Sequence, residues 1–193
     1  IHSPGGKVLK NIIGGDFKGE LYVLNPKKDI VQGIKSYNNP NDLPEVDCAI
    51  IGIAAKFVPE TVEILAKKKN TKAFLVLSAG FSEESEEGAK LEKQIVDTVN
   101  SVDGCMLGPN IIGFLNPNYN GVFTTPIPKL DPKGVDFVSG SGATAVFIME
   151  ASMPKGLTFS SVYSVGNSAQ MGVEEVVKYW DESYDPETSS NVK

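Results

Sequence analysis

The sequence predicts an α/β fold in which a parallel β-sheet domain is followed by a second, partial α/β domain. Short apolar stretches rich in β-branched residues alternate along the chain with stretches of helical period, as in a parallel sheet with crossover helices. A segment with three prolines, residues 124–133, interrupts this alternation before it starts again. The 193 residues are enough for one large domain or two smaller ones.

The first domain opens with small residues and a helix. Ser3-Pro4-Gly5-Gly6 is typical of a turn, and apolar residues at helical spacing predict a helix over residues 7–14. Residues 20–24 are predicted to form a strand that Asn25-Pro26 ends, and residues 33–37 a short strand or a turn. In a Rossmann domain an apolar strand leads into the glycine-rich turn. We therefore expect a further strand to precede residue 1.

The rest of the first domain repeats strand and helix. A continuous apolar run predicts a central strand, and Pro59 suits the first turn of the helix after it. Ser82 is a candidate N-cap for the next helix, which has acidic residues in its first turn. The predicted order is strand 47–53, helix 58–69, strand 73–77, helix 83–102 and strand 105–107, which runs into Gly108-Pro109-Asn110. This alternation indicates right-handed parallel connections.

The second domain begins after the prolines. We assign residues 1–125 to the first domain, 126–133 to a linker and 134–193 to the second domain. The predicted order within the second domain is strand 135–138, helix from about 143, strand 159–165 and helix 172–180. Two strand–helix units cannot cover both faces of a parallel sheet, so we expect this domain to continue beyond residue 193.

Composition argues against several classes of partner. The formal net charge is −6 and no basic stripe is present, which argues against nucleic acid. No apolar run approaches the roughly 20 residues of a membrane span and no signal peptide opens the chain, so we expect a cytoplasmic protein without membrane contact. Cys48 and Cys105 lack partners at metal-ligand spacing and are expected to be small buried hydrophobic residues. The single histidine, His2, is expected to be a flexible surface residue, so we assign no metal ligand and no catalytic residue.

Two turns of small residues follow the strands of the second domain. Ser139-Gly140-Ser141-Gly142-Ala143-Thr144 leads into a helix, and Ser164-Val165-Gly166-Asn167-Ser168-Ala169 follows the next strand. Backbone N–H groups at a helix N-terminus favour an anion, and parallel strands end at one edge of their sheet. The alternative is that both segments are ordinary tight turns. The candidate phosphate-binding residues are Ser139, Ser141, Gly142, Ala143, Gly166 and Asn167.

The end of the predicted strand 20–24 differs from that of an NAD-binding domain. An Asp or Glu occupies this position where the ribose of NAD is bound. This chain instead carries Val23, Asn25, Pro26, Lys27 and Lys28 there. Ammonium groups attract a phosphorylated ribose, which favours coenzyme A (CoA) or NADP over NAD. The alternative is a solvated turn with two surface lysines.

The predicted loop at residues 78–81 suits an uncharged part of a ligand. Glu83 and Glu84 already satisfy the dipole of the helix that follows, so a phosphate is not expected there. The small residues Ala79 and Gly80, together with Phe81, suit the pantetheine arm of CoA better.

Six motifs in one order give the chain a family resemblance. They are Ser3-x-x-Gly6-Lys7-Val8, Val23-x-Asn25-Pro26-Lys27, Ser78-Ala79-Gly80-Phe81-Ser82-Glu83, Gly108-Pro109-Asn110-x-x-Gly113, Val138-Ser139-x-Ser141-Gly142-Ala143 and Ser164-Val165-Gly166-Asn167. Together they resemble the NDP-forming acyl-CoA synthetases, relatives of the succinyl-CoA synthetase alpha subunit, over nearly the whole chain. The resemblance implies a Rossmann-like CoA-binding domain and the first part of a flavodoxin-like ligase domain. The expected CoA-binding residues are Ser3, Gly6, Lys7, Val23, Asn25, Pro26, Lys27, Lys28, Ile53, Ala54, Ala55, Ser78, Ala79, Gly80, Phe81, Pro109 and Asn110.

The resemblance also implies a reaction and partners. The family passes a phosphoryl group from an acyl phosphate through a histidine to ADP, while CoA takes the acyl group. That histidine belongs to a later part of the ligase domain, and ADP or ATP with Mg²⁺ binds a separate ATP-grasp domain or beta subunit. This segment alone is therefore expected to be inactive, within an oligomeric ligase. Two positions depart from the family: Ile111 replaces a frequent Cys, and Gly140 replaces a frequent Gln or Arg that could help to hold phosphate.

Two other functions remain open from the sequence. A non-catalytic CoA- or nucleotide-binding regulatory module would carry the same domains. A histidine-bearing loop after residue 193, accompanied by an ATP-grasp domain, would distinguish the enzyme from that module. An NADP-dependent dehydrogenase is less favoured, because no Lys, His or Tyr acid–base candidate is placed beside a second substrate site.

Overall fold

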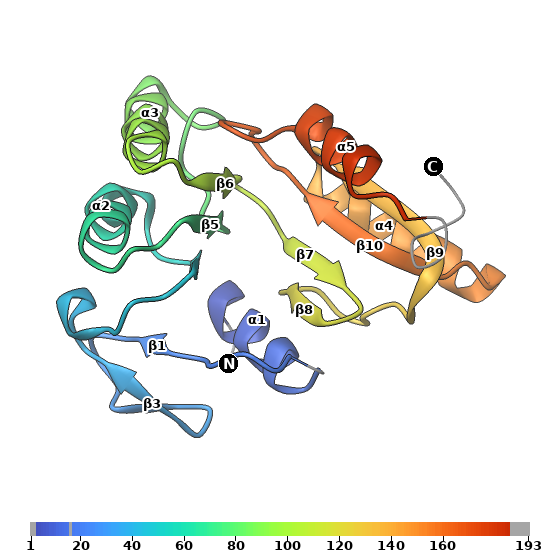
Figure 1. Cartoon of the computed structure of the whole chain (residues 1–193), viewed down its shortest axis with the longest axis horizontal. Helices are drawn as coiled ribbons and strands as arrows, with labels where there is room; N and C mark the ends of the chain where they lie inside the picture. Colours follow the sequence, from blue (N-terminus) through green and yellow to red (C-terminus); the bar gives the residue numbers. More distant parts are fainter. Residues whose placement is uncertain (1–2, 16, 186–193) are drawn as a thin grey trace.

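The computed structural model describes residues 3–15 and 17–185, and Figure 1 shows how their elements are arranged. The helices are α1 (Pro4–Ile13), α2 (Val58–Lys68), α3 (Glu86–Asn100), α4 (Gly142–Ser152) and α5 (Val173–Glu182), with short 3₁₀ turns at Pro40–Asp42, Ala55–Phe57 and Met153–Lys155. The strands are β1 (Val23–Leu24), β2 (Ile30–Val31), β3 (Ile34–Tyr37), β4 (Cys48–Ile51), β5 (Ala73–Val76), β6 (Cys105–Leu107), β7 (Gly113–Asn116), β8 (Tyr119–Val122), β9 (Leu130–Ser139) and β10 (Phe159–Ser164). The prediction for His2 lies outside the described residues.

A parallel sheet of β4, β5 and β6 forms the centre of the first region. The strands lie in this order, and Leu75 pairs with Ile50 on one side and Leu107 on the other. Alternate residues of a strand point to opposite faces. One face, which includes Phe74 and Met106, packs against α2 and α3, and the other packs against α1 and α5. Helices on both faces of a parallel sheet confirm the predicted α/β class.

A second small sheet has the order β1-β3-β2. β1 pairs in parallel with β3, whereas β2 and β3 form a tight hairpin through Gln32 and Gly33, both of which have positive φ. The predicted strand 20–24 is thus reduced to its last residues, and the ambiguous segment 33–37 is largely strand. Among the described strands, β1 and β4 share no ladder, so each forms an edge of its own sheet.

The third sheet joins the two halves of the chain in the order β8-β7-β10-β9. β7 and β8 form a hairpin, β7 pairs antiparallel with β10, and β10 pairs in parallel with β9. α4 covers one face through Ala145 and Met149, while α1 and α5 lie near the opposite face. The hairpin lies before the predicted boundary at residue 125 yet shares a sheet with strands after it, and β9 begins inside the predicted linker. The boundaries themselves stay predictions.

Two helices begin at positions other than those predicted. α1 starts at Pro4 rather than residue 7, because Ser3 caps it by accepting from the Gly6 N–H at 3.2 Å, so the predicted turn is the first helical turn. α3 starts at Glu86, capped by Ser85, rather than at Glu83 capped by Ser82. The reason is that the Glu83 carboxylate turns back and accepts from the Gly80 N–H, while residues 82–84 form a turn before the helix.

The prediction that both cysteines are buried is wrong. Cys48 and Cys105 are exposed. Each is the first residue of its strand, and both pair in register with Ala73 of β5, so they lie at the amino edge of the sheet, outside its apolar clusters. A search of residues 3–15 and 17–185 finds no helix long and apolar enough to cross a membrane.

Candidate functional site

The turns that follow several parallel strands meet around one cavity of about 750 Å³. It lies where β4, β5, β9 and β10 end, beside the amino end of α1. Its lining residues are Pro4, Gly52, Ile53, Leu77, Ser78, Ala79, Asn110, Ile111, Ile112, Phe123, Gly140, Ser141, Gly142, Ala143, Gly166 and Asn167. Ligands of open α/β sheets bind outside the carboxyl ends of the strands, so this is the position expected of a ligand site.

Many residues predicted from the sequence meet in this cavity. They are Ile53, Ser78, Ala79, Asn110, Ser141, Gly142, Ala143, Gly166 and Asn167. The predicted residues that do not line it are Ser3, Gly6, Lys7, Val23, Asn25, Pro26, Lys27, Lys28, Ala54, Ala55, Gly80, Phe81, Pro109 and Ser139. An apolar part of the wall, which the sequence motifs did not indicate, is made by Leu77, Ile112 and Phe123. Leu77 directly follows β5, so the rule that ligands bind at strand ends could have identified it.

The two anion-binding candidates lie on one edge of their sheet, as predicted. β9 and β10 are parallel neighbours, with Ser139 paired to Ser164, so the turns that follow them open on the same side. Adjacent strands are about 4.8 Å apart. Both turns can therefore reach one ligand, and Gly142 and Gly166 do line the same cavity.

The amino end of α4 presents free donors to this cavity. Ser141 is the N-cap, and its hydroxyl oxygen accepts from the Thr144 N–H at 3.3 Å. The N–H groups of Gly142 and Ala143, in the first turn, have no carbonyl four residues earlier within the helix. The helix dipole adds roughly half a positive charge at this point. Ile112 leaves no room for a side chain at position 142, because a Cβ on Gly142 would lie 2.5 Å from a side-chain methyl of Ile112.

The hydroxyl of Ser139 is not available as an anion donor, in contrast to the prediction. It donates to the Ser141 carbonyl at 2.9 Å and accepts from the Ser141 N–H at 3.2 Å. The Ser141 amide is thereby also engaged. A ligand anion would therefore meet the amides of Gly142 and Ala143 and the hydroxyl proton of Ser141.

The turn after β10 is anchored to the segment after β6. The Asn167 N–H donates to the Pro109 carbonyl at 3.0 Å, and the Ala169 N–H donates to the Gly108 carbonyl at 3.2 Å. Gly166 has a φ of 56°, and a Cβ there would lie 2.2 Å from the Pro109 carbonyl oxygen. This turn therefore contributes fewer free amides than predicted and instead fixes one wall of the cavity.

The side chain of Asn167 is hydrogen-bonded on the side of α3. Its Nδ2 donates to Glu83 at 2.5 Å and to Glu92 at 2.8 Å, and it lies 3.2 Å from the Ser82 hydroxyl, which also donates to Glu92. Glu83 in turn accepts from the N–H groups of Gly80 and Phe81. Burial alone would raise the pKa of Glu83, but the hydrogen bonds from Asn167 and Gly80 outweigh it and the pKa is lowered.

The loop after β5 is held by internal hydrogen bonds. The Ser78 hydroxyl donates to the Ile53 carbonyl at 2.5 Å and accepts from the Ile53 N–H at 3.1 Å. The Phe81 side chain is fully buried in the apolar core under α2 and α3. Ser78 therefore acts by joining two loops of the cavity wall. The buried ring of Phe81 belongs to the core, and the assignment of Ala79, Gly80 and Phe81 to the pantetheine arm stays a prediction.

The basic end of β1 lies outside the cavity wall. Lys27 and Lys28 are exposed, and the Asn25 side chain accepts from the Lys27 N–H at 3.0 Å, which shapes the turn between them. Among the residues that the structure describes, no cluster of three or more His, Cys, Asp or Glu side chains could hold a metal ion.

Replacing Glu83 with Gln is expected to destabilise the chain at neutral pH and to have little effect in acid. The folded-state pKa of Glu83 is lower than its ordinary value of 4.5, so its contribution is fully present above that value. The contribution is lost as the pH falls through the folded-state pKa. In urea unfolding, the difference between the wild type and Glu83→Gln should be constant above about pH 5.5 and shrink below pH 4.5.

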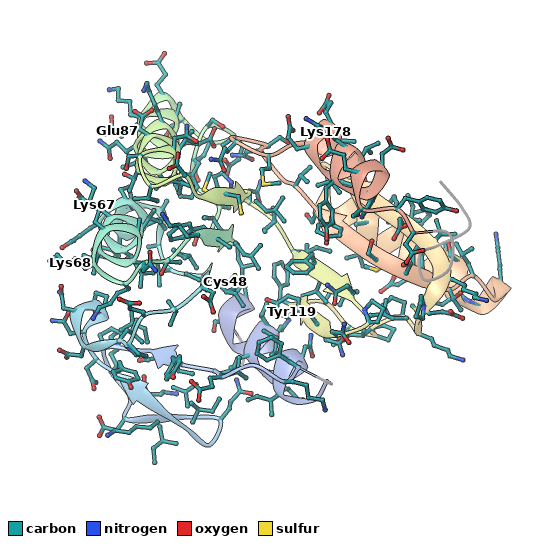
Figure 2. The ribbon with its side chains drawn as sticks, in the orientation of Figure 1. Cys48, Lys67, Lys68, Glu87, Tyr119 and Lys178 are labelled. Carbon is teal, nitrogen blue, oxygen red and sulfur yellow. The ribbon has the colours of Figure 1, made fainter. Side chains whose placement is uncertain are left out.

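The matched control for this prediction is Glu87→Gln. Glu87 lies on the outer side of α3 (Figure 2) and pairs with Lys90 at 3.1 Å, where both side chains are exposed. Exposed pairs contribute little, so this variant should differ from the wild type by less than about 0.5 kcal/mol throughout. A Glu83→Gln effect that stayed unchanged down to pH 3 would contradict the assigned role of the carboxylate.

Comparison with known families identifies both parts of the chain. A family model described as a CoA binding domain matches residues 1–108. A second, described as a succinyl-CoA ligase like flavodoxin domain, matches residues 132–192. These matches confirm the two kinds of domain predicted from the motifs.

Individual proteins match most of the chain. The 4-hydroxybutyrate–CoA ligase (ADP-forming) of Nitrosopumilus maritimus is 35% identical over 91% of this chain, which spans 25% of that protein. The acetate–CoA ligase (ADP-forming) II subunit alpha of Pyrococcus furiosus is 34% identical over 91% of this chain and 38% of its own length. The dinucleotide forming acetyl-coenzyme A synthetase 1 of Ca. Korarchaeum cryptofilum, solved in complex with phosphate and ADP, has a TM-score of 0.85 at 30% identity and covers 97% of this chain and 39% of its own. The chain thus spans about a quarter to two-fifths of these proteins.

Proposed function

From the membership of this chain in the NDP-forming acyl-CoA synthetase family, we propose that its cavity brings the thiol end of CoA beside a phosphoryl group. Within that family, the chain corresponds to the CoA-binding domain and the start of the ligase domain. In this proposal, the full-length enzyme to which the chain belongs interconverts acyl-CoA, NDP and phosphate with a free acid, CoA and NTP. The histidine that carries the phosphoryl group and the nucleotide site belong to parts outside this chain.

One observation carries this proposal: loops of the CoA-binding domain and turns of the second domain line a single cavity. Ile53 and Ala79 come from the first of these, and Gly142 and Gly166 from the second. An enzyme that transfers an acyl group between phosphate and a thiol must hold both within reaction distance. Two separate pockets would not meet this requirement.

The character of the wall fits such a pair of ligands. Leu77, Ile112 and Phe123 offer apolar surface to the uncharged arm of CoA. The amides of Gly142 and Ala143 at the start of α4 face the same space and suit a phosphoryl group. When bound, CoA supplies the thiol that accepts the acyl group.

The residues of this chain act by binding and orientation. The N–H groups of Gly142 and Ala143 donate to phosphoryl oxygens, and the dipole of α4 stabilises the negative charge that remains on phosphate when the acyl group leaves. Among residues 3–15 and 17–185, no lysine lines the cavity, so these donors hold the anion without offering a competing proton carrier.

The proposal includes partners for the whole protein. An ATP-grasp domain or a beta subunit binds ADP or ATP with Mg²⁺, and the assembled enzyme is an oligomer. Support comes from the Pyrococcus furiosus relative, which is named as a subunit alpha, and from the Ca. Korarchaeum cryptofilum relative, which was solved with phosphate and ADP.

Charge reversal at the end of β1 is expected to weaken CoA. We assign Lys27 or Lys28 to the ribose 3′-phosphate, with Asn25 beside them. One charge-assisted hydrogen bond is worth about 1.5–3 kcal/mol, so Lys→Glu at the contacting residue should raise the Kd of CoA at least about tenfold in calorimetry. The chain should also bind dephospho-CoA more weakly than CoA.

The control for net charge is Lys178→Glu. Lys178 is exposed on α5 and lies on the opposite side of the molecule from β1 in Figure 2. This variant carries the same charge change and should keep the wild-type affinity for CoA. Equal affinities for CoA and dephospho-CoA would remove the ribose-phosphate assignment, and no CoA binding at all would remove the proposed function.

A further inference from the structure

A chain of hydrogen bonds links the two sides of the cavity through Glu83. On one side, Glu83 accepts from the Gly80 N–H at 2.7 Å and the Phe81 N–H at 3.2 Å. On the other, it accepts from Asn167 Nδ2 at 2.5 Å. A single carboxylate thus ties the backbone of the loop after β5 to a side chain of the turn after β10.

Both ends of this series of hydrogen bonds reach the cavity wall. Ala79, immediately before Gly80, lines the cavity on the side of the CoA-binding domain, and Gly166 and Asn167 line it on the side of the second domain. A shift of the loop at Gly80 would therefore strain the hydrogen bonds that join this loop through Glu83 to the amide of Asn167.

Asn167 also keeps two like charges apart from each other. Its single amino group donates to Glu83, which precedes α3, and to Glu92, which lies within α3. An amide supplies two hydrogens and satisfies both carboxylates. Without it, Glu83 keeps its bonds from the Gly80 and Phe81 N–H groups and Glu92 keeps its bonds from Ser82, but the donor that the two carboxylates share is lost, which disfavours the observed arrangement.

Other contacts hold the same segment in place without Asn167. Gln170 Nε2 donates to Asn100 at 2.6 Å and to the Gly104 carbonyl at 3.2 Å, and Met171 forms a parallel bridge with Leu107 of β6. The backbone bonds of residues 167 and 169 to Pro109 and Gly108 add to these. Loss of the Asn167 side chain therefore leaves the segment docked and removes the hydrogen bonds of that side chain to Glu83, Glu92, Ser82 and Asn110.

We propose that Glu83 and Asn167 are positioning residues that couple the two halves of the cavity, so that phosphate at α4 and CoA at the loop after β5 strengthen each other's binding. This inference rests on the proposed function. Each ligand orders the part of the cavity wall that it contacts, and the hydrogen bonds through Glu83 and Asn167 transmit that order to the opposite part of the wall. The second ligand then binds a site that is already organised, and the coupling is reciprocal.

The test measures CoA affinity by calorimetry on the 193-residue chain, with inorganic phosphate or with chloride at matched ionic strength. In the wild type, saturating phosphate should lower the Kd of CoA at least about fivefold, the lower end of typical couplings. Asn167→Ala should still bind CoA but show less than a twofold effect of phosphate. Glu83→Gln should behave likewise, because the carboxamide places a donor where Gly80, Phe81 and Asn167 already donate.

Asn118→Ala is the matched control, since Asn118 is exposed in the hairpin between β7 and β8. This variant should keep the full effect of phosphate. The inference is overturned if wild-type CoA affinity is unaffected by phosphate, or if Asn167→Ala retains the effect, and in both cases CoA binding itself leaves the proposed function standing. Absence of CoA binding under every condition would overturn the proposed function, and the inference with it.

Discussion

Replacement of Ser141 by Asp is expected to keep α4 folded and to weaken phosphate binding by at least about fiftyfold. Asp is as good an N-cap as Ser, so it can accept from the Thr144 N–H in place of the Ser141 hydroxyl. Its charge would lie at the entrance to the free amides of Gly142 and Ala143. Two unit charges about 4 Å apart repel by about 4 kcal/mol near a protein surface, which exceeds the 2.3 kcal/mol or so that corresponds to a fiftyfold loss.

The measurement is a phosphate titration of the wild type, Ser141→Asp and Ser141→Asn, followed by calorimetry. Asn is isosteric with Asp and also caps helices, so Ser141→Asn tests the shape of the side chain without its charge. That variant should bind phosphate within about fivefold of the wild type. Thermal unfolding should place all three proteins close together. Undiminished phosphate binding by Ser141→Asp would show that the anion binds elsewhere.

Replacement of Gly166 by Ala is expected to lower the free energy of unfolding by about 3–5 kcal/mol. The residue has a φ of 56°, in the left-handed region that disfavours side chains. The added methyl would also lie 2.2 Å from the Pro109 carbonyl oxygen and 2.6 Å from that of Asn110. Both are backbone atoms, so the contacts can be relieved only if the main chain shifts. Backbone strain of about 1–3 kcal/mol and overpacking of about 1–3 kcal/mol add to about 2–6 kcal/mol, a range centred on the expected loss.

Gly140→Ala is the matched control, because Gly140 occupies the other turn at the same sheet edge and a Cβ there would meet nothing within 4 Å. It should change the free energy of unfolding by less than about 0.5 kcal/mol. Thermal denaturation should separate the two variants by roughly 6–20 °C. If both glycines tolerated Ala equally, the tight docking of residue 166 against the segment after β6 would be wrong.

The sequence predicted the position of the candidate site better than the roles of its residues. The turns at Ser141 and Gly166 could be placed together because small residues directly follow two strands, and parallel strands end on one edge. The roles of Phe81 and Ser139 depend on tertiary contacts and on a hydroxyl that bonds to its own turn. Local patterns carry no information on either.

Glu83 illustrates a second limit. Its position after Ser82 suggested an ordinary first helical turn, because local capping rules consider only neighbours along the chain. Asn167, its partner, is 84 residues away in sequence. The pairing of β7 with β10 escaped prediction for the same reason: a strand's own pattern indicates that it pairs, but not which distant strand it joins. The prediction that the cysteines are buried was wrong because the pattern of a strand does not show where the helices that cover the sheet end.

The pairing of β7 with β10 also imposes an order on folding during synthesis. Leu115 of β7 is fully buried in the finished sheet, where it lies opposite Val162 of β10. A two-stranded hairpin alone is at best marginally stable in water. Until β10 has left the ribosome, the hairpin therefore carries an apolar side chain and an unpaired backbone edge into solvent. That interval is when the nascent chain is most open to chaperone binding and to association with other copies, since closing the long connection limits the rate at which the sheet forms.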